Sequence, residues 1–153
     1  MSINAGYRLR PTLFAGIGYS GGFYSPKYEI AGGNVYRTAY QQGLFVVLRG
    51  ILPLGRLDLG LELSPGVSRV VFRPDTEIDI KHYSQGFALR PGVSADVWLG
   101  RQVFVGVKAD LVLNLHRNAC TRIGDRSTCE HKQSMDNVAV HQLIAGVHLG
   151  GTF

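Results

Sequence analysis

Long apolar runs and a recognisable leader are both missing from this sequence of 153 residues. No window approaches the ~18 continuous apolar residues of a transmembrane helix, because even the most apolar stretch, residues 43–55, contains Arg49 and Pro53. Any contact with a membrane must therefore be made by strands. The first residues, MSINAGYRLRP, contain neither a basic segment nor an apolar core, and so predict no signal peptide.

Cysteine and clustered basic residues are also scarce. The two cysteines do not form a CxxC pair, which makes the sequence signal for zinc weak. The net charge of +5 could suit nucleic acid, yet the basic residues neither cluster on a helix nor alternate with stacking aromatic residues. No nucleic-acid partner is therefore predicted, and the cations are interpreted as a solvated rim that faces lipid phosphates.

Alternation of apolar and polar residues is the main pattern that is present. Between residues 103 and 115 every odd position is aliphatic, whereas the even positions include Lys108 and Asp110. Residues 86–99 alternate in the same way, with Arg90 and Asp96 on the polar face, and a turn at 100–102 joins the two runs. Period two identifies strands. Each run exceeds the ~5 to 6 residues of a common globular strand and matches the ~9 to 11 that cross a bilayer at a tilt.

Seven such strands can be assigned in a single domain that spans residues 1–153. They cover about residues 3–9, 13–20, 37–51, 57–68, 86–99, 103–116 and 139–153, and the 20 glycines suit strands that bend. Short turns near residues 10, 54 and 100 alternate with longer polar loops at 21–36, 73–80 and 118–136. Apolar outer faces, charged inner faces and turns that alternate with loops predict an all-β, antiparallel up-and-down transmembrane β-barrel.

Eight charged residues lie on the predicted inner faces, four of each sign. They are spread over five strands among opposite charges, and so predict ion pairs that fill a lumen too narrow for a channel. Paired carboxylates could also serve acid–base catalysis. The predicted network comprises Arg8, Arg49, Arg90, Lys108, Asp58, Glu62, Asp96 and Asp110.

With these strands in place, and with Phe153 ending the chain after Val147 and Leu149 on the same face, the sequence resembles the small outer-membrane β-barrels of Gram-negative bacteria, the OmpA/OmpX-like group. Gly151 stands where that family usually has an aromatic residue. The resemblance implies a place in the bacterial outer membrane, contact with its lipid and lipopolysaccharide, and no cofactor. It also implies that the barrel-assembly machinery reads the last strand, which ends at Phe153.

The strand count departs from this family, because bacterial single-chain barrels have even numbers of strands. The first and last predicted strands both run toward the short turns, so direct closure would require a parallel pair. One further ascending strand before the first would restore antiparallel closure. Together with the missing leader, this predicts an N-terminally truncated barrel whose intact parent has eight strands.

Cys120 and Cys129 lie in the longest predicted loop, in a compartment where thiols oxidise. A disulfide between them is predicted. His116 and His131 flank the cysteines, which leaves a zinc site as the alternative.

Three cations, Arg69, Lys81 and Arg117, point outward by strand parity but lie past the apolar bands at the loop ends. Near the interface an outward Arg or Lys costs almost nothing, and the phosphates of lipopolysaccharide would favour it. A lipid-phosphate rim is therefore predicted, and ordinary snorkelling is the alternative. Aromatic interface girdles are predicted from Tyr19, Phe23, Tyr36, Tyr40, Tyr83 and Phe87 at the loop ends, and from Tyr7 and Phe153 at the turn ends.

A non-enzymatic structural or surface-interaction protein is the function predicted from this pattern. An outer-membrane lipid-modifying enzyme is a second hypothesis, which needs a cluster of His, Ser and an acid near the outer rim; none is evident in the sequence. A soluble lipocalin-like ligand-binding barrel is a third, although such barrels place their apolar face inside.

Overall fold

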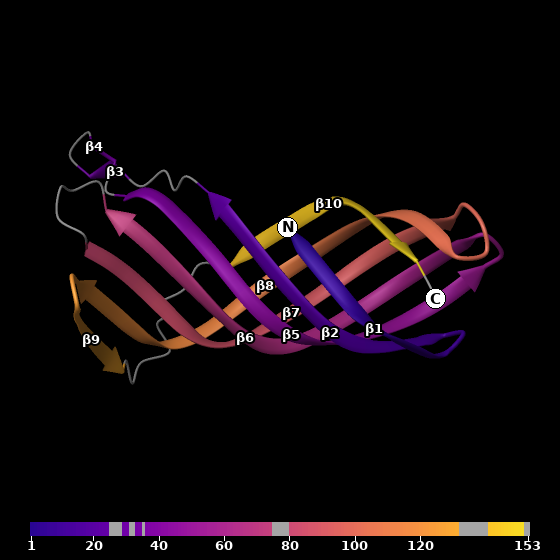
Figure 1. Ribbon diagram of the computed structural model, residues 1–153, viewed down its shortest axis with the longest axis horizontal. Helices are drawn as coiled ribbons and strands as arrows, with labels where there is room; N and C mark the ends of the chain where they lie inside the picture. Colours follow the sequence, from indigo (N-terminus) through magenta and orange to yellow (C-terminus); the bar gives the residue numbers. More distant parts are fainter. Residues whose placement is uncertain (25–28, 31–32, 35, 75–79, 132–140, 152–153) are drawn as a thin grey trace.

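The protein is all-β. The computed structural model describes residues 1–24, 29–30, 33–34, 36–74, 80–131 and 141–151 (Figure 1). Seven strands follow one another across the sheet: β1 (Ser2–Arg10), β2 (Leu13–Tyr24), β5 (Tyr36–Leu54), β6 (Leu57–Pro74), β7 (Ile80–Trp98), β8 (Val103–Ile123) and β10 (Gln142–Gly151). Two short hairpins are added by β3 (Glu29–Ile30) with β4 (Gly33–Asn34), and by β9 (Arg126–His131), which pairs with β8. No helix within these residues is long and apolar enough to cross a membrane.

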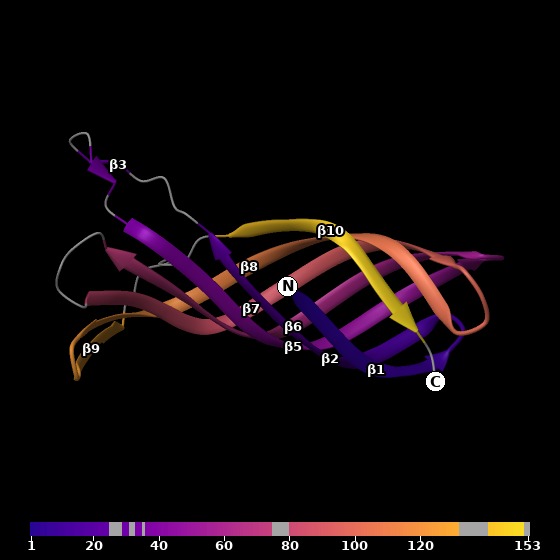
Figure 2. The same ribbon diagram turned by 45° about the horizontal axis from the view of Figure 1, so that its top comes forward.

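The seven strands form an antiparallel up-and-down sheet that curls into a half-barrel, as Figures 1 and 2 show. Every strand of the curled sheet pairs with its neighbour in sequence, which confirms the predicted strand number and order. In the described part of the chain, the sheet ends at β1 on one side and at β10 on the other. Both edge strands run toward the turn end of the sheet.

The alternation of the sequence produces the two faces of the sheet. On β5, Leu44 and Val46 are 56% and 53% exposed, whereas Phe45 and Val47 between them are 1% and 0% exposed. Successive side chains point to opposite faces of a strand, so the concave face is buried and the convex face is open. The convex face is apolar, and the concave face carries most of the charges.

The middle of the concave face is packed with apolar side chains. Phe45, Ala88 and Val112 form a buried apolar cluster there. The run 44–48 of β5 is apolar on both faces: Phe45 and Val47 are buried on the concave face, whereas Leu44, Val46 and Leu48 are exposed on the convex face. The interior is a mixed core and not solely a charge plug.

The strands extend further toward the loop end than the sequence predicts. β7 begins at Ile80 instead of residue 86, and β8 continues to Ile123 instead of residue 116. Within the predicted loop 118–136, β9 folds back on β8 through a turn in which Gly124 has a φ of 55°. Residues 132–140 and 152–153, including Phe153, lie outside the described residues, as do 25–28 and 75–79 of the other predicted loops.

Candidate functional site

The charged residues on the concave face are joined by ion pairs, and Glu62 is the common partner. Its two carboxylate oxygens lie 3.0 Å from Arg49 Nη2, 3.1 Å from Arg90 Nη2 and 2.8 Å from Lys108 Nζ. Ser64 Oγ also donates a hydrogen bond to this carboxylate at 2.8 Å. One buried anion therefore contacts three cations from three strands.

The remaining predicted charges extend this network in both directions. Lys108 Nζ lies 3.3 Å from Asp110, and Arg49 Nη1 lies 3.4 Å from Asp96. Arg8 contacts Asp58 at 3.0 Å, nearer the turns. Each of the eight residues thus contacts an opposite charge on this face.

Two residues outside the predicted set join the network. Trp98 Nε1 donates a hydrogen bond to Asp58 at 2.9 Å, and His148 Nε2 lies 2.8 Å from Asp96 Oδ1. Strand parity predicts that both side chains point inward. It does not predict that Trp98 contacts Asp58 of β6 or that His148 contacts Asp96 of β7, because those contacts depend on the register between strands.

Arg90 is the most deeply placed charge, with 0% exposure. Its guanidinium carbon lies 4.5 Å from the centre of the Phe45 ring, while Nη2 contacts Glu62. A cation over a ring face that is shielded from water is stabilised by the ring quadrupole. Arg90 therefore links the apolar cluster to the charged one.

Glycines leave the room that this packing requires. A Cβ atom at Gly92 would collide with the Asp110 carboxylate, and a Cβ atom at Gly106 would collide with the Asp96 carboxylate. These contacts explain why glycines alternate with charged residues on the concave face of β7 and β8.

A second polar cluster, uncharged, lies toward the loop end. His116 Nε2 is 2.8 Å from Ser68 Oγ, and His116 Nδ1 is 2.9 Å from Ser84 Oγ. Asn114 Oδ1 accepts hydrogen bonds from Ser68 at 2.6 Å and from Gln41 at 3.2 Å. All five side chains are buried. We call this set the serine–histidine cluster; sequence spacing did not reveal it because its members come from four strands.

The number of protons fixes the direction of these hydrogen bonds. Because the single hydroxyl proton of Ser68 goes to Asn114, Ser68 must accept from His116 Nε2–H. A neutral imidazole then has no proton on Nδ1, so Ser84 donates to it. The oxygen of Ser84 keeps its lone pairs for another partner.

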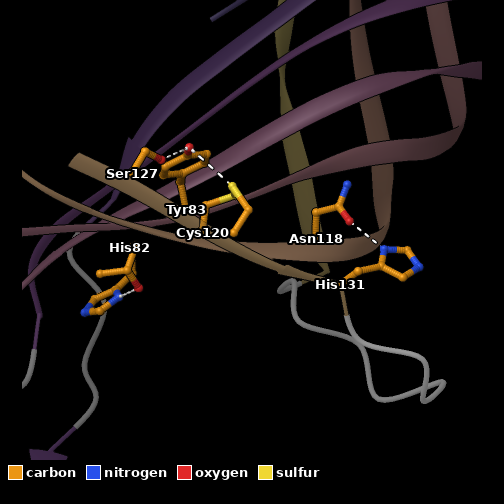
Figure 3. The surroundings of a disulfide bond; sticks show 8 residues. His82, Tyr83, Asn118, Cys120, Ser127 and His131 are labelled. Atoms are coloured by element: carbon orange, nitrogen blue, oxygen red, sulfur yellow. Dashed lines mark hydrogen bonds between the residues drawn. A yellow bond between two sulfur atoms is a disulfide. The ribbon is translucent and has the colours of Figure 1, made fainter. Parts of the chain in front are cut away.

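Cys120 and Cys129 form a disulfide, as predicted, between directly paired positions of β8 and β9. Figure 3 shows the Tyr83 ring beside this bond, with its hydroxyl 2.8 Å from Ser127 Oγ, while His82 leaves β7 on the other face and lies 3.1 Å from Thr121 Oγ1. The disulfide and Tyr83 therefore tie the hairpin to the convex face.

The two histidines of the zinc alternative lie on opposite faces. His116 belongs to the buried serine–histidine cluster, whereas His131 Nδ1 lies 2.7 Å from Asn118 Oδ1 on the convex side (Figure 3). Both thiols are used by the disulfide. Over the described residues, no group of three or more His, Cys, Asp and Glu side chains is arranged to hold a metal ion.

The predicted rim cations are not one cluster. Arg69 lies over the Tyr83 ring at 4.3 Å and shares a row of the sheet with Gln85 and Asn118. Arg117 is exposed next to this row, at a register shift between β7 and β8. Lys81 lies closer to the strand tip and is paired with Arg122, a fourth cation that the sequence pattern did not single out.

The aromatic residues at the loop end divide between the two faces. Phe23 and Tyr40 contact each other on the convex face, with ring centroids 5.9 Å apart. The sequence predicts Tyr36 in the same girdle. In the structure Tyr36 instead contacts Phe72 and His82, which share a row on the concave face. A register shift between Tyr36 and Thr38 accounts for this reversal of parity.

No protein-family model, curated protein or solved structure matches this chain.

Proposed function

We propose that the protein is a bacterial outer-membrane β-barrel with a filled interior and a structural or surface-interaction role. One observation carries the proposal: the convex face of the long strands is apolar and exposed, while the charges face a packed interior. Leu61, at 69% exposure, and Val107, at 57%, are typical of it. A soluble barrel buries such side chains, so a lipid environment is the arrangement that satisfies them.

The length of the apolar band supports this environment. From Phe87 to Val97 every outward side chain of β7 is apolar. At about 3.4 Å per residue this stretch is about 34 Å long, and a tilt of 35–45° reduces its height to about 25 Å, the apolar band of outer-membrane barrels. Outward positions 57–67 of β6 and 105–115 of β8 give the same length.

The side chains that fill the interior argue against an open channel for solutes. Glu62 and Arg90 are buried and paired on the concave face, and Phe45 of the apolar cluster packs against Arg90. Buried, paired charges that leave no room for an additional Cβ atom occupy the space that a channel would need.

A further strand is expected to close the barrel. β1 and β10 both run toward the turn end, so one strand antiparallel to both could pair with each of them. Open edges in lipid leave backbone groups without partners, at a cost of several kcal/mol for each group. We therefore expect an eighth strand that alternates apolar residues outward with small or polar residues inward.

The cations beyond the apolar band suit the headgroup region of the same membrane. Arg69 and Arg117 lie one row above Phe87, where the outward residues change from apolar to polar. Phosphates of lipopolysaccharide are the expected counterions, and an arginine can bind a phosphate through two hydrogen bonds.

Refolding into phospholipid vesicles tests the proposal. The protein is expected to float with the vesicles, to stay resistant to trypsin in its strands, and to give no steady ion conductance in a planar bilayer. A folded, monodisperse protein in buffer without lipid or detergent would overturn the membrane assignment. Steady conductance in the folded state would overturn the filled interior.

A lipid-modifying enzyme is a second candidate, favoured by one observation. Ser84 Oγ and His116 Nδ1 are 2.9 Å apart, which is the spacing of a nucleophile and its base. The other ring nitrogen of His116 contacts the Ser68 hydroxyl, where a hydrolase usually has a carboxylate. Labelling of the protein, but not of Ser84→Ala, by a fluorophosphonate would favour the enzyme, and an unlabelled protein would exclude this nucleophile.

A further inference from the structure

A cleft opens on the concave face above the serine–histidine cluster, where β5 to β9 extend past the apolar band. Its volume is about 440 Å³, within the range of small-ligand sites. Its side chains come from paired rows of the sheet: Phe72, His82, Thr121 and Thr128 in one, and Ser84 with Glu130 in the next. Tyr36 forms part of the wall.

Aromatic rings form one side of this cleft. Phe72 and Tyr36 have ring centroids 5.2 Å apart, and the His82 ring meets Tyr36 edge to face at 6.4 Å. The Tyr24 ring meets Phe72 edge to face as well, with ring centroids 6.4 Å apart. Rings that hold one another in place provide a rigid apolar surface at little conformational cost.

Hydrogen-bond acceptors form the other side. The hydroxyl proton of Ser84 is directed at His116, so its oxygen can accept a hydrogen bond from a ligand. Glu130 adds a carboxylate at the exposed margin. The serine–histidine cluster holds Ser84 in this orientation, and a ligand that donates hydrogen bonds therefore meets an acceptor that is already aligned.

The charge at the cleft opposes an anion. Glu130 adds a carboxylate at its margin, which would repel an anion. Arg73, Lys81 and Arg122 alternate with the cleft residues along their strands, so their side chains point to the convex face and not into the cleft. An uncharged ligand that donates hydrogen bonds avoids the repulsion by Glu130.

We propose that this cleft binds a neutral saccharide, with one sugar ring against Phe72 and Tyr36 and its hydroxyl groups donating to Ser84 and Glu130. Sugars combine the required features, because their hydroxyls donate hydrogen bonds while one face of the ring carries only C–H groups. The site does not depend on membrane insertion, since it lies on the strands beyond the apolar band.

Saturation-transfer NMR and calorimetry with neutral mono- and disaccharides test this proposal. The protein is held in a zwitterionic detergent, because detergents with sugar headgroups would occupy the site. Saturable binding of at least one saccharide is expected, without binding of tetramethylammonium or acetate. Binding of either ion in place of every saccharide, or no saturable binding at all, would overturn the proposal.

Two variants locate the site. Ser84→Ala removes the aligned acceptor, and Glu130→Ala removes the carboxylate of an exposed residue of β9. Each is expected to weaken binding by about tenfold or more, as loss of a hydrogen bond to a ligand hydroxyl does. Gln85→Ala, on the convex face of the same strand, is the matched control and should bind normally. Normal binding by both cleft variants would overturn the proposal.

Discussion

At the scale of single residues, Glu62 shows how few positions organise the interior. Strand parity placed Glu62 among seven other inward charges, but could not show that three cations share its carboxylate. That convergence depends on the register between β5, β6, β7 and β8, which alternation alone leaves open. The members of the network were therefore predictable, and its centre was not.

Replacing Glu62 with Gln tests this central position. The change keeps the shape of the side chain but leaves Arg49, Arg90 and Lys108 without their shared anion, and loss of one partner of a buried pair costs about 3–5 kcal/mol. Asp125→Asn, at a fully exposed carboxylate, is the control and should change stability little. Urea unfolding from vesicles measures both, and equal midpoints for the two variants would contradict the role of Glu62.

Gly92 provides a second test, which concerns space. An alanine there would push its Cβ atom into the Asp110 carboxylate, and overpacking of this kind typically costs about 1–3 kcal/mol. Gly50→Ala is the matched control, because the nearest atom to its Cβ would be 3.9 Å away. The same unfolding measurement should separate the two variants, with Gly50→Ala neutral or slightly stabilising.

At the scale of elements, the sequence predicted strands well within the apolar band and poorly beyond it. Past residue 116 the outward side chains of β8 become polar, so the alternation disappears although the hydrogen-bonded pairing continues to Ile123. The register shift between Gln85 and Phe87 also reverses parity for the residues that follow on β8. Backbone hydrogen bonds between strands do not require alternating apolar residues, so a strand with polar side chains on both faces cannot be predicted from alternation.

The apolar band predicts a position-dependent response to arginine. Leu61→Arg is expected to cost about 2–4 kcal/mol in vesicles, because position 61 lies near the middle of the outward face. Gln85→Arg, above the band on the same face, should cost less than about 1 kcal/mol. Equal effects of the two substitutions would indicate that lipid does not cover this face.

The disulfide should act locally on the β8–β9 hairpin. It closes a loop with a sequence separation of 9, for which chain entropy predicts about 2–3 kcal/mol of stabilisation. In the double variant Cys120→Ser, Cys129→Ser, amide exchange should accelerate in residues 118–131 while the urea midpoint of the barrel stays unchanged. A lower midpoint for the whole barrel would show that the hairpin supports the sheet.

At the scale of the whole molecule, strand directions were predictable because turns and loops alternate along the chain. The arrangement of the loop end was not, since the cleft and the serine–histidine cluster combine residues from β5 to β9. Their assembly depends on two register shifts that change which side chains face inward.

The edges of β1 and β10, which are unpaired among the described residues, lead to the last prediction. A strand fused before Ser2 through a polar loop, with apolar residues outward and small or polar residues inward, should raise the stability of the barrel in vesicles. A fused strand of the same composition without alternation is the control, because its side chains cannot match the two faces. Equal unfolding midpoints for the two fusions would contradict closure by an eighth strand.

The order of the strands also determines how the chain can fold. Each strand of the curled sheet pairs with the strand next to it in sequence, so a growing sheet adds one hairpin at a time and each step closes only a short loop. Pairing of β10 with a strand that precedes β1 would be the single step with high contact order. Assembly should therefore proceed quickly to an open sheet and then wait for ring closure, and during that interval the two free edges are available to a second chain.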